Sequence, residues 1–166
     1  MPLARRPLLL VLALVALVAV AGCGSDSKES ASSSATPTAE STPAATKPEV
    51  TVPKGKLPNK LEITDLKKGT GATAEPGKNV TVQYVGVSAL NGRQFDASWD
   101  RGEPFSFQLG SGGVIQGWDE GVKGMKVGGR RQLVIPPDLA YGPDGSPPTI
   151  GPNETLVFVI DLVSVD

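Results

Sequence analysis

The chain has 166 residues, of which 39% are hydrophobic and 20% charged, and its 16 basic and 17 acidic residues give a net charge of −1. No basic stripe is visible, so a nucleic-acid partner is not expected. Because the chain has no histidine and a single cysteine, we expect no metal site, no cofactor and no intramolecular disulfide. Stability must therefore come from packing alone.

Residues 1–22 are typical of a secretory signal peptide. Arg5 and Arg6 precede an apolar run from 8 to 20, and the small residues Ala21 and Gly22 follow. The run is shorter than the roughly 20 apolar residues that a transmembrane helix needs. A lone arginine pair is weak evidence for twin-arginine export, so the usual export route is preferred.

The single cysteine, Cys23, follows this leader directly. The stretch 20–23 resembles the bacterial lipobox, which implies that the thiol receives a diacylglyceryl group and becomes the mature N-terminus. Two acyl chains anchor stably, whereas one chain of about 14 carbons is marginal. The resemblance implies an extracytoplasmic protein, lipid-anchored to the bacterial cell membrane. The alternative is an ordinary signal peptide that happens to contain a cysteine.

Residues 23–59 are interpreted as the lipidated cysteine and a disordered tether. After Cys23 the sequence is Ser, Thr, Ala, Pro and Lys with no aromatic residue. Such a composition buries too little apolar surface to offset the entropy of ordering. A partner-binding role for the segment has no motif behind it.

Residues 60–166 are expected to form one domain with a single core. Apolar residues alternate, or run continuously, in four stretches that predict strands. These stretches are 79–85, 105–109, 131–135 and 156–160. Asn91-Gly92 favours a hairpin turn, and Pro136-Pro137 ends the third stretch.

One helical pattern interrupts the strands. Apolar residues recur at spacings of three and four at Ile115, Trp118, Val122 and Met125. Glycines within the same stretch weaken a helix, so packing against the sheet must hold it. The predicted fold class is α+β: an antiparallel, curled sheet of about five strands wrapped around one short helix.

The aromatic residues are grouped in the chain. All of them fall between Tyr84 and Phe158, a stretch without cysteine or histidine. This grouping suggests one apolar core with a pocket that binds an apolar ligand by shape and desolvation, with Asp96 as a polar contact. It points to a reaction that needs no acid, base or nucleophile.

A series of motifs then follows in a characteristic order and spacing. They are 82–86 (VQYVG), 95–98 (FDAS), 104–110 (PFSFQLG), 114–121 (VIQGWDEG), 125–128 (MKVG), 141–142 (YG) and 153–158 (NETLVF). Together they resemble the FKBP-type peptidyl-prolyl cis–trans isomerases, and the resemblance covers essentially all of residues 60–166. The enzyme class that this implies accelerates rotation about X–Pro bonds, with proline-containing exported polypeptides as partners and macrolides as possible inhibitors.

The resemblance also implies a set of site residues. Trp118 is the floor of an aromatic cup, Ile115 donates its backbone N–H to a substrate carbonyl, and Tyr141 offers its hydroxyl to another. Asp96 sits beside Tyr84 and Arg101 as a polar corner and does not transfer protons. The walls and rim are expected from Tyr84, Phe95, Phe105, Phe158 and Val114.

Alternatives stay open for some of these residues. Periodicity alone makes Trp118 a core residue, and Phe158 lies in the most apolar strand. Phe107 and Leu109 are expected in the core, and Trp99 at the surface or rim. Departures from the family pattern at Gly113 and in the loop 142–153 concern substrate preference. The alternative functions are a proline-peptide-binding chaperone or docking module with little turnover, and a domain with only a structural role and no pocket.

Overall fold

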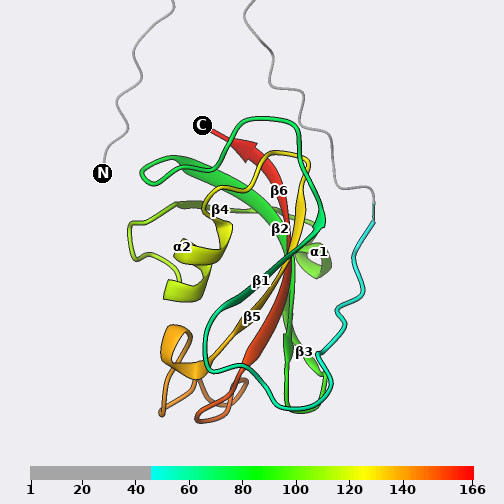
Figure 1. Ribbon diagram of the computed structural model, residues 1–166, viewed down its shortest axis with the longest axis vertical. Helices are drawn as coiled ribbons and strands as arrows, with labels where there is room; N and C mark the ends of the chain where they lie inside the picture. The colour runs from blue at the N-terminus through cyan, green and yellow to red at the C-terminus, as the bar shows by residue number, and fades with distance from the viewer. Residues whose placement is uncertain (1–45) are drawn as a thin grey trace, which may run out of the picture. The chain divides into compact units, whose positions relative to one another are not determined.

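The computed structural model describes residues 46–166, and an antiparallel sheet curling around a short helix dominates it (Figure 1). The elements, in chain order, are β1 (Glu62–Lys67), β2 (Asn79–Ser88), β3 (Gln94–Ala97), α1 (Ser98–Arg101), β4 (Phe105–Gln108), α2 (Gln116–Val122), β5 (Arg130–Ile135), the 3₁₀ turn η1 (Pro137–Leu139) and β6 (Leu156–Val165). The predicted fold class is confirmed, with six strands in place of about five.

The sheet is built around its two longest strands. β2 and β6 pair from Val80↔Val165 to Ser88↔Leu156, and the strand order is β1-β5-β6-β2-β3, with β4 also paired to β2. The four stretches predicted as strands lie in β2, β4, β5 and β6. β1 and β3 were not predicted: a register irregularity interrupts β1, and β3 has only four residues.

The two faces of the sheet differ in what covers them. The inner face carries the main core, where strand residues such as Val82, Leu133 and Ile160 pack with Trp118 and Val122 of α2. The outer face carries a smaller buried cluster, which we call the outer cluster, made of Val85, Val87, Ala97, Val134 and Val157. Side chains alternate along each strand, so one strand supplies both clusters.

Two helix glycines let α2 lie close to β5. A Cβ on Gly117 would stand 2.9 Å from Ile135 Cδ1 and closer still to its Cγ2, and one on Gly121 would stand 2.7 Å from Leu133 Cδ2. Distances below 3 Å are not tolerated between carbon atoms, so a side chain at either position forces a rearrangement. The glycines that weaken the helix are thus the residues that seat it against the sheet.

Arg131 caps the C-terminal end of α2. Its Nη1 donates to the carbonyl oxygens of Gly121 at 2.8 Å and Lys123 at 3.2 Å, and its Nε donates to Asp65 Oδ1 at 2.6 Å. A cation at a helix C-terminus offsets the partial negative charge of the free carbonyls. β1 is thereby tied to α2 through β5.

The Arg131 hydrogen bond, with a smaller contribution from its charge, lowers the pKa of Asp65 below its ordinary value of 3.8. A lowered folded-state pKa stabilises the fold above the unfolded pKa, and this contribution is lost as pH falls through the folded value. We expect Asp65→Asn to be less stable than the wild type at pH 6 and the difference to shrink as the pH falls below 3.8, vanishing once it has passed the lowered folded-state pKa. Urea titrations at both pH values test this, and a difference that persists at low pH would contradict the ion-pair explanation.

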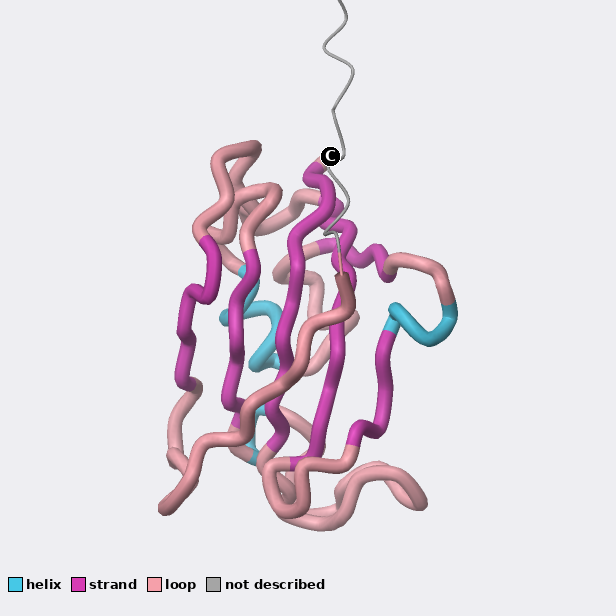
Figure 2. The backbone as a smooth tube through the Cα atoms, turned by 90° about the vertical axis from the view of Figure 1, so that its right-hand side faces the viewer, coloured by secondary structure: helices cyan, strands magenta, loops and turns pink. Residues whose placement is uncertain are grey.

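The sequence predicts a disordered tether up to residue 59; the structure describes residues 46–59 of it and places part of this segment on the sheet. The segment crosses the strands on the face opposite α2 (Figure 2), and Val50 and Val52 pack against the outer cluster. Thr46 O accepts a hydrogen bond from Arg130 Nη2 at 2.9 Å. Isolated valines among prolines and lysines give no periodic signal, which is why the sequence did not reveal this contact.

The predicted signal peptide, Cys23 and the first part of the linker lie outside the described residues. Across residues 46–166, no helix is both long and apolar enough to cross a membrane.

Candidate active site

All the residues predicted for the aromatic cup line one cavity of about 210 Å³ on the inner side of the sheet. They come from four strands, the helix α2 and two loops that are far apart in the sequence. The lining residues are Tyr84, Phe95, Asp96, Phe105, Gly113, Val114, Ile115, Trp118, Tyr141 and Phe158. The structure therefore brings together what the sequence distributes over 75 positions, and it adds Gly113, which sequence reasoning had named only as a departure.

The rings meet mainly edge to face. Trp118 is the hub: its ring centroid lies 5.0 Å from that of Tyr84, 5.3 Å from Phe158 and 6.0 Å from Phe105, with interplanar angles of 74° to 88°. Phe95 contacts this group of rings through Phe158, with 5.5 Å between the two ring centroids. T-shaped pairs at these separations stabilise one another beyond their buried area, so the cup is preformed.

Trp118 is both core and floor. Only 4% of its surface is exposed, and α2 places it one turn from the buried Val122 on the helix stripe. Its indole Nε1 is buried without a hydrogen-bond partner among the described residues. A donor left unpaired beneath a cavity is available to a bound group.

Two further donors face the cavity. Ile115 precedes α2 with extended backbone angles (φ −60°, ψ 146°), and within residues 46–166 no acceptor pairs with its N–H. Tyr141 follows η1, is 41% exposed, and its hydroxyl makes no side-chain hydrogen bond to another described residue. Both groups can bind ligand carbonyls without breaking an existing bond.

Asp96, Tyr84 and Arg101 form a polar corner at the side of the cup. The Tyr84 hydroxyl donates to Asp96 Oδ2, Arg101 Nη1 pairs with Asp96 Oδ1, and Arg101 Nη2 donates to the Tyr84 hydroxyl at 2.9 Å. The guanidinium also lies 5.6 Å from the centroid of the Tyr84 ring. The corner is closed on itself, which suits orientation and electrostatics better than proton transfer.

Other aromatic residues lie outside the cavity. Phe107 packs beneath it, with its ring 5.7 Å from Phe105 and 5.6 Å from Trp118, while Leu109 is fully buried. Trp99 lies on the outer face, against the outer cluster. Within the described part of the chain, no three Asp, Glu, Cys or His side chains gather as metal ligands would.

Comparison with known proteins decides the family. A family model described as FKBP-type peptidyl-prolyl cis-trans isomerase matches residues 71–163. The chain belongs to this family. Its members are peptidyl-prolyl isomerases, an enzyme class whose reaction requires neither metal nor covalent intermediate, in keeping with the apolar cup.

Curated FKBP-type relatives are similar over the whole domain. An "FK506-binding protein" of Streptomyces anulatus is 57% identical over 120 residues, 72% of this chain and 97% of the relative. A "Probable FK506-binding protein" of Corynebacterium glutamicum is 53% identical over 118 residues, 71% of this chain and 98% of the relative. A match that covers 72% of a 166-residue chain includes at least 119 of its residues and therefore begins no later than residue 48.

Solved FKBP-type structures share the fold. The crystal structure of AtFKBP13 has a TM-score of 0.59 and 38% identity over 64% of this chain and 93% of its own. The crystal structure of FkpA from Escherichia coli has a TM-score of 0.59 and 46% identity over 64% of this chain and 48% of its own.

The cup's titrating groups set its pH dependence. Burial, reinforced by the hydrogen bond to Asp96, raises the pKa of Tyr84 above 10, and burial followed by the Asp96 charge raises that of Tyr141. Both hydroxyls thus stay neutral donors in ordinary buffers, and the chain has no histidine. We expect kcat/KM for a proline peptide to be constant between about pH 6 and pH 9. A bell-shaped profile with a limb near pH 7 would contradict this FKBP-type account.

Proposed function

We propose that this chain isomerises X–Pro bonds of exported polypeptides by holding the prolyl group in the cup lined by Trp118, Tyr84 and Phe158. The observation that carries the proposal is the conjunction of a cavity lined by aromatic rings with three donors that have no partner among the described residues, the Trp118 indole at its floor and the Ile115 N–H and Tyr141 hydroxyl at its rim. Rotation about the bond crosses a barrier of about 18–20 kcal/mol because it breaks amide resonance.

The cup lowers this barrier by desolvation and orientation. A planar amide is more polar than the twisted one, so moving it from water into an aromatic cavity costs the planar ground state more than the transition state. A thousandfold acceleration requires about 4 kcal/mol of differential stabilisation. The N–H of Ile115 and the hydroxyl of Tyr141 orient the carbonyls on either side of the proline, and no proton or electron pair is transferred.

Asp96 acts in this scheme through its charge. Asp96→Asn keeps the shape of the side chain but weakens its pairs with Tyr84 and Arg101. We expect kcat/KM to fall about three- to tenfold, roughly 0.7–1.4 kcal/mol, with little loss of stability because the carboxylate is half-exposed. Peptide isomerisation assays on both proteins, with Asp138→Asn on the exposed η1 turn as control, test this. Equal activity would remove Asp96 from the mechanism.

We further propose that the protein is a lipoprotein anchored through Cys23. The leader at 1–22 and the single cysteine directly after it support this. Cys23→Ser should move the protein from the membrane fraction to the soluble extracytoplasmic fraction, while unchanged fractionation would defeat the anchor. The variant leaves the cup intact, so isomerase activity serves as the internal control.

Macrolide binding is proposed for the same cavity. The Streptomyces and Corynebacterium relatives bear names that describe FK506 binding, and the cup residues enclose a space that suits an apolar ligand with paired carbonyls. FK506 should inhibit isomerisation competitively with a proline peptide.

Refolding of an exported protein whose folding waits on proline isomerisation tests the physiological step. The chain should accelerate the slow phase in proportion to its concentration. An unchanged slow phase, together with measurable binding of the unfolded protein, would instead favour a chaperone module that uses the cup without turnover.

A further inference from the structure

One segment of the described chain has no role in the site so far. Residues 46–53, which we call the strap, cross the outer face of the sheet (Figure 2) and precede the family match that begins at residue 71. The match to the Streptomyces relative, by contrast, begins no later than residue 48. Most of the strap therefore lies within the stretch that matches this relative, 97% of whose own length is covered.

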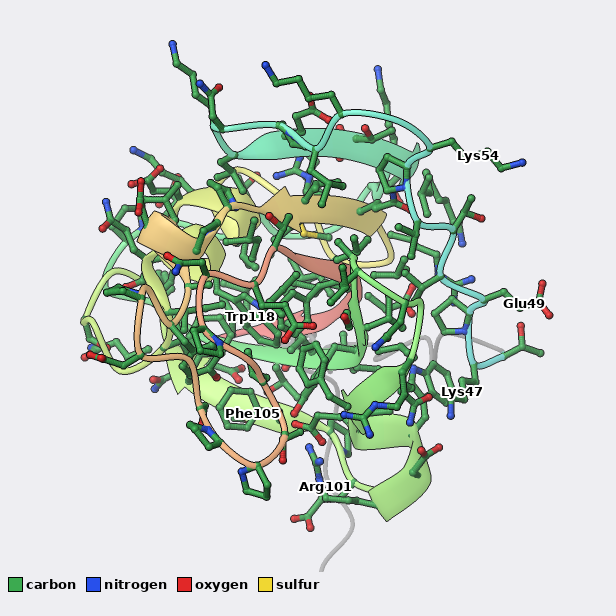
Figure 3. The ribbon with its side chains drawn as sticks, turned by 90° about the horizontal axis from the view of Figure 1, so that it is seen from below. Lys47, Glu49, Lys54, Arg101, Phe105 and Trp118 are labelled. Atoms are coloured by element: carbon green, nitrogen blue, oxygen red, sulfur yellow. The ribbon has the colours of Figure 1, made fainter. Side chains whose placement is uncertain are left out.

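The strap reaches the sheet at a particular place. Val50 and Val52 pack against the same outer cluster as Trp99, and Lys47 Nζ pairs with Asp100 Oδ1. Trp99 and Asp100 are the middle residues of α1. Figure 3 shows the strap, with Lys47 and Glu49, on one side of the sheet and Trp118 with Phe105 on the other; Lys54 directly follows the strap.

α1 needs such support because it is a single turn. A helix this short does not hold itself together, and its N-cap residue, Ala97, makes no side-chain cap. On the inner side, the buried Ser98 accepts the backbone N–H of Tyr84 at 2.8 Å. On the outer side, Asp100 pairs with Lys47 of the strap and also accepts a hydrogen bond from Gln94 Nε2 of β3 at 2.6 Å. Trp99 packs on the outer cluster that Val50 and Val52 also cover, so α1 lies between the sheet and the strap.

The same turn connects two residues of the cup's polar corner. Asp96 lies on the edge strand β3, two residues before the first residue of α1, and Arg101 is the last residue of α1. Their ion pair and the Arg101 bond to Tyr84 depend on the position of this turn. A shift of α1 would move both charges relative to the cup.

We propose that the strap positions Asp96 and Arg101 by bracing α1 from behind, making it a part of the catalytic unit. The inference rests on the proposed isomerase function. Val50 and Val52 are positioning residues: they touch no substrate and act through Trp99 and α1. Tilting of the polar corner, and not loss of the fold, is the expected consequence of releasing the strap.

The test is a double-mutant cycle in the full chain. Val50→Ser/Val52→Ser should lower kcat/KM about three- to fivefold when Asp96 is present, and less than about 1.5-fold in an Asp96→Asn background, because both changes disable the same corner. The matched control is Ile63→Ser/Leu66→Ser, which changes two half-exposed apolar residues on β1 and should leave kcat/KM unchanged. Equal factors in both Asp96 backgrounds would show a general structural effect and overturn the proposal.

Fluorescence reports strap release independently of activity. In a Trp118→Phe background Trp99 is the only tryptophan, and its Nε1 is buried. The valine double variant should shift its emission to longer wavelength, as water reaches the ring. No shift would overturn the contact, and a shift with unchanged kcat/KM in the Trp118 protein would overturn the positioning role.

Two further arms keep the result interpretable. If circular dichroism shows that the serine variant is unfolded, Val50→Ala/Val52→Ala replaces it. For this variant we expect a fall in kcat/KM of the same dependence on Asp96 but of smaller size. Lys47→Ala, compared with Lys54→Ala on the solvent-facing part of the segment (Figure 3), tests the Asp100 contact alone, and equal activity of these two variants removes that contact from the bracing.

A wild-type chain without turnover would refute the proposed function, whereas an active wild type with an equally active strap variant would refute only the bracing.

Discussion

Trp118→Leu should lower kcat/KM at least about 100-fold, roughly 2.7 kcal/mol, because it removes the floor on which the prolyl ring rests. The indole is in contact distance of three other cup rings, so its loss also lets water enter the cavity. Leucine keeps the position apolar, which limits the loss of stability to about 2–4 kcal/mol for a large-to-small core change. Isomerisation kinetics at 10 °C, where both proteins are folded, measure the effect.

The matched control lies one turn further along the same helix. Val122 is fully buried in the main core but does not line the cavity. Val122→Ala should cost stability by about 1–2.5 kcal/mol while kcat/KM stays within twofold of the wild type. If the two variants lost activity in proportion to their loss of stability, Trp118 would be a core residue only, as periodicity alone suggests.

Gly117→Ala should destabilise the protein by about 1–3 kcal/mol, although alanine is the better helix former. In an unobstructed helix this change stabilises by about 0.5–1 kcal/mol. Here the new methyl group would collide with three side-chain atoms of the fully buried Ile135, including the branch atom Cγ2 next to its backbone. Overpacking of this kind costs more than the propensity returns.

Gly121→Ala provides the comparison. Its Cβ would meet the flexible end of Leu133, whose methyl groups can turn aside, so we expect a smaller loss of stability than at Gly117. Chemical denaturation of the three proteins measures both changes. A stabilised Gly117→Ala variant would show that α2 is not seated against β5 as described, and with it the position of Trp118 would be in doubt.

The sequence predicted the centre of the sheet and the members of the cup for different reasons. β2, β5 and β6 carry alternating or continuous apolar runs that only a buried strand explains. The grouping of the aromatic residues along the chain suggests a pocket, but Tyr84, Phe95, Trp118 and Tyr141 have no local signal that assigns them to it, and the family resemblance supplies that assignment. Periodicity favoured the core for Trp118, and its 4% exposure shows that this interpretation was also correct.

What the sequence did not reveal depends on contacts between distant segments. β3 and α1 are four residues each, too short for a periodic pattern, and they form because β2 and Ser98 hold them. Val50 and Val52 look like linker residues until the outer cluster offers them a surface. From sequence alone the glycines of α2 look unfavourable for a helix. In the structure their missing side chains leave the space that Ile135 and Leu133 occupy.

Magnetisation exchange between the cis and trans forms of a proline tetrapeptide tests the central claim most directly, because it observes the bond rotation without a coupled protease. Catalytic amounts of the chain should raise the exchange rate in proportion to its concentration, and FK506 should abolish the increase. Exchange at the rate of buffer alone, in the presence of peptide that measurably binds the cup, would contradict catalysis by this aromatic cavity.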